Sequence, residues 1–262
     1  MICNICHKPL TGRYLIDEWG NKMCESHLNR DVDHCASCSA FTRKNHTLPD
    51  GRVLCKTCYN SAIKPGDSIE NVKNFVINCL YNAGFSDLRL EDISFEIVTA
   101  HRLAEIRKAP VDMNIKGYTM SNINTSTLYG IRTNQKCKHN ICMLTHLPKI
   151  EFAGTLAHEM LHTWLAQNSV SMSQKKTEGF CNMGTYLVYS SMPGAFAKMQ
   201  LKSLHESTDP IYGDGFREMY ADFERLGWKE LIGNVRKKGV VSKYFPLYSS
   251  VQEIYEFIKS TV

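Results

Sequence analysis

The chain has 262 residues, of which 43% are hydrophobic, and a formal net charge of +5 from 31 Lys and Arg against 26 Asp and Glu. This length can hold one globular domain with a real core and a small additional module. The modest charge does not predict a general nucleic-acid binder, and the apolar stretches are too short to predict a membrane span.

Two cysteine-rich segments of nearly equal length fill the first sixty residues. Each holds two close ligand pairs, separated by seventeen residues in the first segment and by sixteen in the second. Because two such pairs can close a tetrahedron around zinc, we predict two structural zinc sites. Their ligands are Cys3, Cys6, Cys24 and His27 in the first site, and Cys35, Cys38, Cys55 and Cys58 in the second. Disulfide pairing, as in small secreted proteins, is the alternative.

Zinc binding would account for most of the 11 cysteines, which indicates a compartment where thiols stay reduced. The first ligand lies two residues after Met1, so we expect no signal peptide and a cytoplasmic location. Pro65 and Gly66 break the chain after the second site. We therefore expect a zinc module over 1–64 and a second domain over 65–262. Zinc-bound thiolates would bring the module close to neutral, which again disfavours nucleic acid as a partner.

Beyond residue 65 the pattern predicts a helix, then strands, then more helices. The expected helices span 69–83, with Asp67 or Ser68 as its cap, and 101–108; the expected strands span 93–98, 117–122, 127–133 and 140–145. After Ile150 the chain is predicted to be helical, apart from loops near Pro193 and at 210–213. Strands followed by helices indicate an α+β fold, with a small antiparallel or mixed sheet and a mostly helical C-terminal part.

The pentapeptide His158-Glu159-Met160-Leu161-His162 has the H-E-x-x-H pattern, inside a segment whose apolar residues recur at helical spacing. Residues four apart share one helix face, so both imidazoles can reach one zinc ion. Glu159 would lie beside them as a candidate general base.

A third ligand is expected from Glu178, which follows His162 by sixteen residues and opens a second apolar stretch. Two histidines on one helix and a glutamate on the next would leave the fourth position of a zinc ion for water. The sequence therefore predicts a third zinc ion per chain, a catalytic one. The alternative is a helix with two otherwise satisfied histidines and a solvent-facing Glu178.

A site of this kind suits hydrolysis of a peptide bond, in which Glu159 takes a proton from the activated water and passes it to the leaving amine. Tyr212 and His205 are the candidates for stabilising the developing oxyanion, although Tyr212 can equally be a packed turn residue. We expect an edge strand, either 118–121 or 141–144, to hold the substrate backbone. Asp214 is a candidate to orient a ligand histidine, or else a loop cap.

One further group, Cys137-x-His139-x2-Cys142, has metal-binding residue types but no fourth ligand nearby. We interpret these cysteines as reduced residues near a strand, with an exposed histidine between them. Cys79 and Cys181 are expected to be buried in helices as small hydrophobic residues.

Three segments together resemble a known family, the LIM-domain peptidases that restrict organ size in plants, called the "DA-one" family. The segment 147–165 is similar to that family's active-site helix, Glu178-Gly179 to its third-ligand segment, and Asp209-Pro210-Ile211-Tyr212-Gly213-Asp214-Gly215-Phe216-Arg217 to a further signature of its catalytic domain. The zinc modules match the LIM region of the family in position. The resemblance implies a gluzincin-type zinc endopeptidase that cuts protein partners.

The zinc modules depart from the usual LIM pattern. Seven residues separate His27 from Cys35 where a LIM domain has two, and the first module has Cys-x2-His in place of His-x2-Cys. Plant relatives carry ubiquitin-interacting helices ahead of the LIM domain, which this sequence is expected to lack. A link to ubiquitin therefore rests on the resemblance alone.

The sequence thus predicts a zinc-dependent endopeptidase that acts on protein substrates and recognises protein partners through its LIM-like module, with no nucleic-acid or membrane partner. The alternative is an inactive zinc-dependent adaptor for protein interactions. We further expect Cys55→Ser to impair targeting more than cleavage itself.

Overall fold

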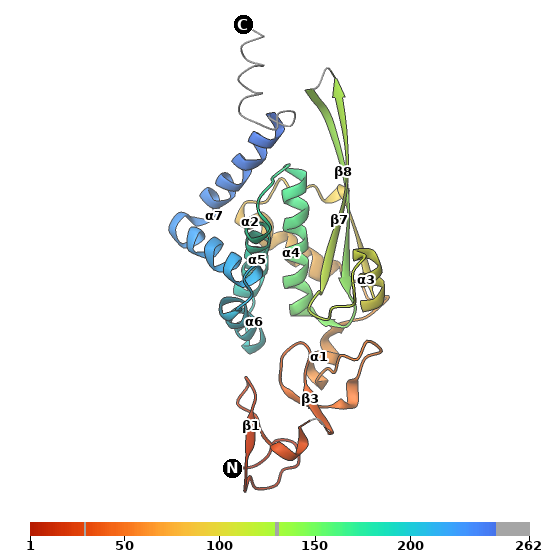
Figure 1. Cartoon of the computed structure of the whole chain (residues 1–262), viewed down its shortest axis with the longest axis vertical. Coiled ribbons are helices and arrows are strands. Elements are labelled where there is room, and N and C mark those ends of the chain that lie inside the picture. Colours follow the sequence, from red (N-terminus) through yellow and green to blue (C-terminus); the bar gives the residue numbers. More distant parts are fainter. Residues whose placement is uncertain (29, 129–130, 245–262) are drawn as a thin grey trace.

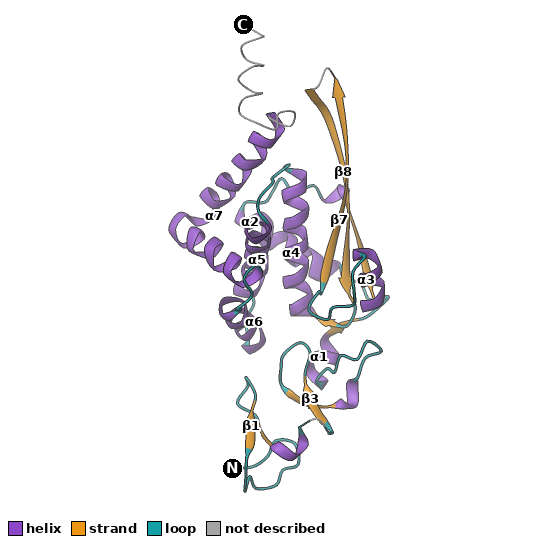
Figure 2. Cartoon of the chain, in the orientation of Figure 1, coloured by secondary structure: helices purple, strands orange, loops and turns teal. Residues whose placement is uncertain are grey.

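The computed structural model describes residues 1–28, 30–128 and 131–244, with side chains described for all of these except 123–128, 131–136 and 239–244. The cysteine-rich segments lie at one end of an elongated molecule, and a mixed helix and strand body follows (Figure 1). Figure 2 shows that helices dominate the C-terminal part, while the N-terminal end is mostly loop with short strands. The predicted α+β class, with small sheets and a mostly helical C-terminal part, is confirmed.

The N-terminal end consists of two small modules, each built on a two-stranded antiparallel sheet. We call the segment from Cys3 to His27 the first module and that from Val32 to Ser61 the second module. The elements are β1 (Tyr14–Ile16), β2 (Lys22–Cys24), the 3-10 helix η1 (Glu25–His27), β3 (Val32–His34), β4 (Phe41–Arg43), the 3-10 helix η2 (Lys44–His46) and α1 (Lys56–Ser61). Few large apolar side chains are buried here, so cysteine ligands occupy much of each small core.

Two hydrogen bonds fasten the first module to the second. The carboxylate of Asp17 accepts a bond of 2.9 Å from the backbone N–H of Phe41. The indole N–H of Trp19 donates to the carbonyl oxygen of Cys38 over 2.6 Å. Both bonds start from the turn between β1 and β2, which therefore positions the modules against each other.

A three-stranded mixed sheet forms one layer of the body. It contains β6 (Ile93–Val98), β8 (Ile131–Leu144) and β7 (Gly117–Leu128) in that spatial order. β6 and β8 are parallel, β7 and β8 are antiparallel, and β7 lies at the edge. The strand expected over 127–133 falls partly outside the described residues; its described ends belong to β7 and β8.

Helices form the other layer. They are α2 (Glu70–Ala83), the 3-10 helix η3 (Leu90–Asp92), α3 (Ala100–Arg107), α4 (Lys149–Gln167), α5 (Gln174–Ser190), α6 (Ala195–Glu206) and α7 (Tyr212–Tyr244), which is broken by non-helical geometry at Gly227. Up to Tyr244 the predicted helices therefore form, within one or two residues of their expected ends; the helical prediction over 245–262 lies outside the described residues. In the described part of the chain, none of the helices has the length and apolar character needed to cross a membrane.

Local signals explain several helix ends. α2 stops at Gly84, whose φ of +113° lies in the left-handed region that favours glycine. The side chain of Thr99 caps α3 by accepting from the backbone N–H of Arg102. Of the two caps expected for α2, Ser68 accepts from the backbone N–H of Glu70 over 3.4 Å, whereas the carboxylate of Asp67 accepts from the N–H of Lys64 and closes the turn before the helix.

The main core lies around α4, which is buried between the sheet, α2 and α5 (Figure 1). Trp164 at its C-terminal end packs edge-to-face against Phe85, with ring centroids 5.2 Å apart, and both rings contact Phe180 of α5. Such aromatic contacts add to the free energy gained by burying these large side chains. The core thus fixes α4 and α5 against each other along their length.

The second module is joined to the body by a short antiparallel pair. β5 (Ala62–Ile63) pairs with β9 (Leu147–Pro148), directly before α4. The buried guanidinium of Arg52 is held by Asp50 and donates to the carbonyl oxygen of Thr145 over 2.7 Å. The start of α4 is therefore anchored on the second module.

Candidate metal centres and the cleft between them

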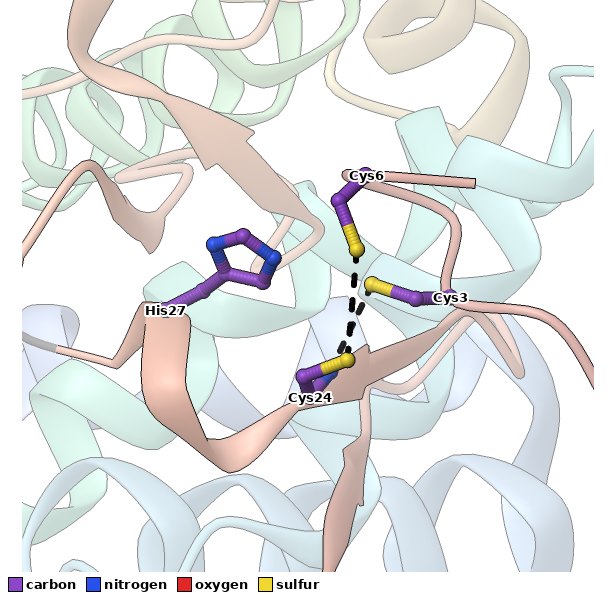
Figure 3. Close-up of side chains that lie close together, drawn as sticks. All are labelled: Cys3, Cys6, Cys24 and His27. Carbon is purple, nitrogen blue, oxygen red and sulfur yellow. Dashed lines mark hydrogen bonds between the residues drawn. The ribbon is translucent and has the colours of Figure 1, made fainter. Parts of the chain in front are cut away.

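The structure brings the predicted ligands of the first site together at one end of the first module. Figure 3 shows Cys3, Cys6, Cys24 and His27 converging, and their ligand atoms lie within 4.8 Å of one another. The sulfurs of Cys6 and Cys24 are 4.0 Å apart. Sulfur ligands at the usual zinc distance and tetrahedral angles are about 3.8 Å apart, so the spacing fits zinc.

The surroundings of this cluster favour the ionised form of Cys3. Backbone N–H groups of Ile5 and Cys24 donate to the sulfur of Cys3 over 3.4 Å each. Although burial raises it, the backbone N–H groups of Cys6, Cys24 and Ile5 lower the pKa of the Cys3 thiol to about 6. The ring of His27 is oriented by Asp31, whose carboxylate oxygen lies 3.1 Å from Nδ1. No spacing in the sequence marks Asp31 for this role.

The four cysteines of the second site also converge, with all sulfurs within 4.8 Å of one another. The sulfurs of Cys38 and Cys55 are 3.7 Å apart, again close to the spacing of ligands around one zinc ion. Backbone N–H groups of Cys55 and Cys58 donate to the sulfurs of Cys35 and Cys55. Both clusters can therefore hold zinc, and the cysteines are reduced rather than paired in disulfides.

The third cluster joins two helices. His158 and His162 lie one turn apart on α4, and Glu178 faces them from the first turns of α5. The two Nε2 atoms are 3.1 Å apart, and each lies 3.2–3.4 Å from Oε2 of Glu178. Nitrogen and oxygen ligands at about 2.0–2.1 Å from a tetrahedral zinc ion are separated by about 3.3–3.4 Å, so these three atoms have the required spacing.

The electrostatics of the cluster favour a positive charge at its centre. Burial raises the pKa of Glu178, but the two imidazoles beside it lower that pKa to about 2. The carboxylate is therefore ionised throughout the neutral range while its ligand oxygen is buried. A buried anion facing two imidazole nitrogens is the donor set expected for zinc with an open fourth position.

Asn182, one turn after Glu178 on α5, fixes the tautomer of His158. Its amide nitrogen donates to the carbonyl oxygen of Tyr212 over 3.1 Å, which places its carbonyl oxygen 2.9 Å from Nδ1 of His158. Because that oxygen can only accept, Nδ1 carries the proton and Nε2 keeps its lone pair for a metal. No sequence motif identified Asn182.

The candidate base Glu159 is buried beside the cluster and held by the edge strand. The hydroxyl of Thr119 on β7 donates to Oε2 of Glu159 over 2.7 Å. Gly117 permits this approach, because a Cβ at that position would lie 2.8 Å from the Glu159 side chain. β7 thus holds the carboxylate of Glu159 at the lining of the cleft that the three ligands also line.

Two glycines bring Tyr212 to the cluster. A Cβ at Gly179 would lie 2.1 Å from the carbonyl oxygen of Gly215, and one at Gly215 would lie 2.3 Å from that of Lys175. α5 and α7 therefore touch backbone to backbone, which explains the glycines of two segments that carry the family resemblance. The ring of Tyr212, at the start of α7, lies 6.5 Å from that of His158.

The two candidates for oxyanion stabilisation lie in different places. Tyr212 lines the cleft, and burial and the carboxylates of Glu178 and Glu159 raise the pKa of its phenol to about 12, so it remains a hydrogen-bond donor. His205 packs instead against Tyr186, Phe216 and Tyr220 on α5 and α7, and it is not among the described residues that line the cleft. The structure therefore brings Tyr212, and not His205, to the cluster.

The other suggested positioning residue, Asp214, is engaged elsewhere. It forms an ion pair with Arg217 and lies 4.0 Å from Lys175, at the junction of α5 and α7. The orienting contact to His158 comes from Asn182 instead.

The three ligands and Glu159 open into a cleft of about 640 Å³ between β7, α4, α5 and α6. Among the described strands β7 pairs with β8 alone, so the segment 118–121 lies on a free edge beside this cleft. The alternative edge, 141–144, is wrong because β8 is the central strand, paired on both sides. Of the two segments considered for strand addition, only that on β7 is accessible to another chain.

The remaining cysteine and histidine group forms no such cluster among the described residues. The interpretation of His139 as exposed is wrong: only 2% of its surface is exposed, and its Nδ1 lies 2.8 Å from the hydroxyl of Ser121. Cys79 and Cys181 are buried in α2 and α5, as expected.

Two cysteine-rich clusters that can hold zinc are followed by an α+β body with a cluster of two histidines and one glutamate. This combination defines a protein with three candidate zinc sites. Residues 97–192, which include β7, β8 and all of α4, match the family model "DA1-like: Protein DA1". The resemblance found in the sequence is confirmed: the chain is related to the DA1-type LIM proteins.

Several plant proteins are similar to this chain. "LIM domain-containing protein HDR3" of Oryza sativa subsp. japonica is 24% identical over 84% of this chain and 56% of its own length. "Protein DA1" of Arabidopsis thaliana is 22% identical over 84% of this chain and 52% of its own length. "Protein DA1-related 2" of the same plant is 23% identical over 94% and 58%. The chain thus spans just over half the length of these relatives. No solved structure matches it.

Proposed function

We propose that this protein is a zinc-dependent endopeptidase of the gluzincin type, with a zincin-like domain after residue 64. Three observations support the proposal: the ligand atoms of His158, His162 and Glu178 have the spacing that zinc requires, Glu159 lies beside them, and a free strand edge borders the same cleft. The convergence of the three ligands with Glu159 carries the proposal.

The roles of the residues follow from their contacts. An extended peptide would add to the edge of β7 and so lie across the mouth of the cleft. Zinc, when bound, supplies a Lewis acid that activates water and polarises the peptide carbonyl. Glu159, held by Thr119, receives the proton of the attacking water and delivers it to the leaving nitrogen. The neutral phenol of Tyr212 donates to the carbonyl oxygen as negative charge develops there.

The two modules would supply structural zinc sites, giving three zinc ions per chain, and recognise protein partners. The names of the relatives support this role, since one of them is named a LIM domain-containing protein. A cytoplasmic location stays a prediction from the sequence, and a link to ubiquitin stays an implication of the family resemblance.

The test is cleavage of a random peptide library by the zinc-loaded protein. We expect cleavage that a chelator abolishes and zinc restores, and that Glu159→Gln reduces by about three orders of magnitude or more while zinc content is unchanged. Glu105→Gln, an exposed glutamate on α3, is the matched control and should keep full activity. Absence of cleavage by the wild type with three zinc ions bound would favour the adaptor alternative.

A further inference from the structure

Almost all charged side chains that line the cleft have an ion-pair or hydrogen-bond partner, or a role in the proposed reaction. Glu178 belongs to the metal cluster, and Glu159 is held by Thr119. Lys116, which precedes β7, forms an ion pair with the buried carboxylate of Glu151 at the start of α4. These contacts leave a single cationic side chain of the described cleft lining without a carboxylate partner, that of Arg107.

Arg107 is the last residue of α3, and its backbone is firmly placed. Leu103 and Ala104 bury the inner face of the helix, and Lys108 ends it in the left-handed conformation with a φ of +53°. The chain then returns to the cleft, where Asn114 and Ile115 lead into β7. α3 lies beside the end of the β7–β8 pair nearest the zinc modules (Figure 1).

The side chain of Arg107 is half-buried, yet in the described part of the chain it makes no hydrogen bond or ion pair. It lines the same cleft as Glu159, Glu178 and Tyr212. A partly desolvated guanidinium with five donors and no acceptor is best satisfied by a carboxylate, which it can bind through two parallel hydrogen bonds.

We propose that Arg107 is a specificity-determining residue that binds a carboxylate of the peptide lying in the cleft. The inference rests on the proposed function and adds the chemistry of the preferred substrate. Because α3 lies beside one end of the β7–β8 pair and Arg107 lines the cleft, a peptide on the edge of β7 would meet Arg107 with one residue, so the preference applies to one position relative to the bond that is cut. A lysine or arginine at that position would face an unscreened like charge and be disfavoured.

Two sources supply the same carboxylate: an acidic side chain within a longer chain, or the free C-terminus of a peptide cut close to its end. Two random libraries of equal length separate them, one with free C-terminal carboxylates and one amidated, both acetylated at the N-terminus. Mass spectrometry of the products gives the residue preference around each cleaved bond. An acidic side chain as the source gives the same enrichment of Asp and Glu in both libraries, whereas a C-terminal source gives cleavage only in the first.

Variants then assign the preference to Arg107. For a peptide carrying the preferred carboxylate, we expect Arg107→Gln to reduce kcat/KM roughly 10- to 100-fold, chiefly through KM, because a charge-assisted contact made equally in the bound and transition states is lost. A matched peptide without that carboxylate should be cut equally by both proteins. Arg107→Glu should invert the preference toward Lys and Arg, and Lys108→Gln, which removes the same charge one residue away, should retain it.

Four results would overturn the inference. The wild type could cleave peptides without any carboxylate preference, or Arg107→Gln could keep the same preference. Either result would show that Arg107 does not select a carboxylate of the substrate, and it would leave the endopeptidase assignment intact. A fall in kcat of equal size for every peptide would place Arg107 in the chemistry itself instead. A wild type that binds zinc and cuts neither library removes the proposed function and this inference with it.

Discussion

Gln200 of α6 donates a hydrogen bond of 3.0 Å to the carbonyl oxygen of Ser37, inside the Cys35–Cys38 turn of the second module. The same glutamine lines the cleft. Phe196 and Met199 of α6 pack against the cysteine cluster, and Lys202 forms an ion pair of 3.2 Å with Glu18 of the first module. The wall of the cleft that α6 forms is therefore held by contacts with both modules.

This arrangement changes the expected effect of Cys55→Ser. The sequence alone suggested that the variant would impair targeting more than cleavage. Because the second module supports α6 and anchors the start of α4 through β5 and β9, we now expect it to lose one zinc ion and to cut a short peptide at least about tenfold more slowly. The measurement is zinc content together with kcat/KM on a peptide too short to reach the modules. Loss of zinc with unchanged kcat/KM would contradict the coupling.

Zinc content also separates the three clusters. We expect three zinc ions per chain in the wild type and two in His162→Ala, since the open site cannot hold zinc with one histidine and one glutamate. His205→Ala, which removes a histidine from the aromatic cluster, should retain three. Two zinc ions in both the wild type and His162→Ala would mean that the cluster on α4 and α5 does not bind zinc.

Asn182 provides a test of ligand positioning. Asn182→Leu removes the acceptor that holds the proton on Nδ1 of His158, and we expect zinc at the open site to bind about 10- to 100-fold more weakly. Competition with a chelator of known affinity measures the change. Asn78→Leu, on the exposed side of α2, is the control. Unchanged zinc affinity in Asn182→Leu would show that the hydrogen bond does not set the tautomer of His158.

The glycine contact between α5 and α7 predicts a difference between two Gly→Ala variants. Gly179→Ala places a methyl group 2.1 Å from a backbone oxygen that cannot move away alone, and we expect a loss of about 1–3 kcal/mol in the free energy of unfolding. Gly233→Ala on α7 meets no atom within 4 Å and should be neutral or stabilise the helix by up to about 1 kcal/mol. Denaturant unfolding measures both, and equal stability of the two variants would refute the close-contact argument.

The metal clusters could be anticipated from the sequence because their information is local. Cys3 and Cys6 lie in one turn, and His158 and His162 on one helix face, so spacing alone brings each pair together. Glu178 could be added because it opens the next helix, and neighbouring helices joined by a short loop pack antiparallel.

The residues that support those ligands could not be anticipated in this way. Thr119 and Asn182 are single polar residues, with no spacing to mark them, that reach the cluster only when β7 and α5 pack against α4. His205 shows the converse, since it is close in sequence to the segment of Tyr212 but faces Phe216 and Tyr220 on α7. Proximity along the chain does not determine the direction of a side chain at the end of a helix.

Three contacts hold the modules in a fixed position relative to the cleft. They are the hydrogen bond from Trp19 to Cys38, the pairing of β5 with β9, and the packing of α6 against the second module. A protein held by the modules would therefore enter the cleft at a fixed reach from the point where it is held. Such an enzyme would choose its cutting site by distance as well as by local sequence, so inserting residues between the held segment and the cut bond of a substrate would move the cut by the same number of residues.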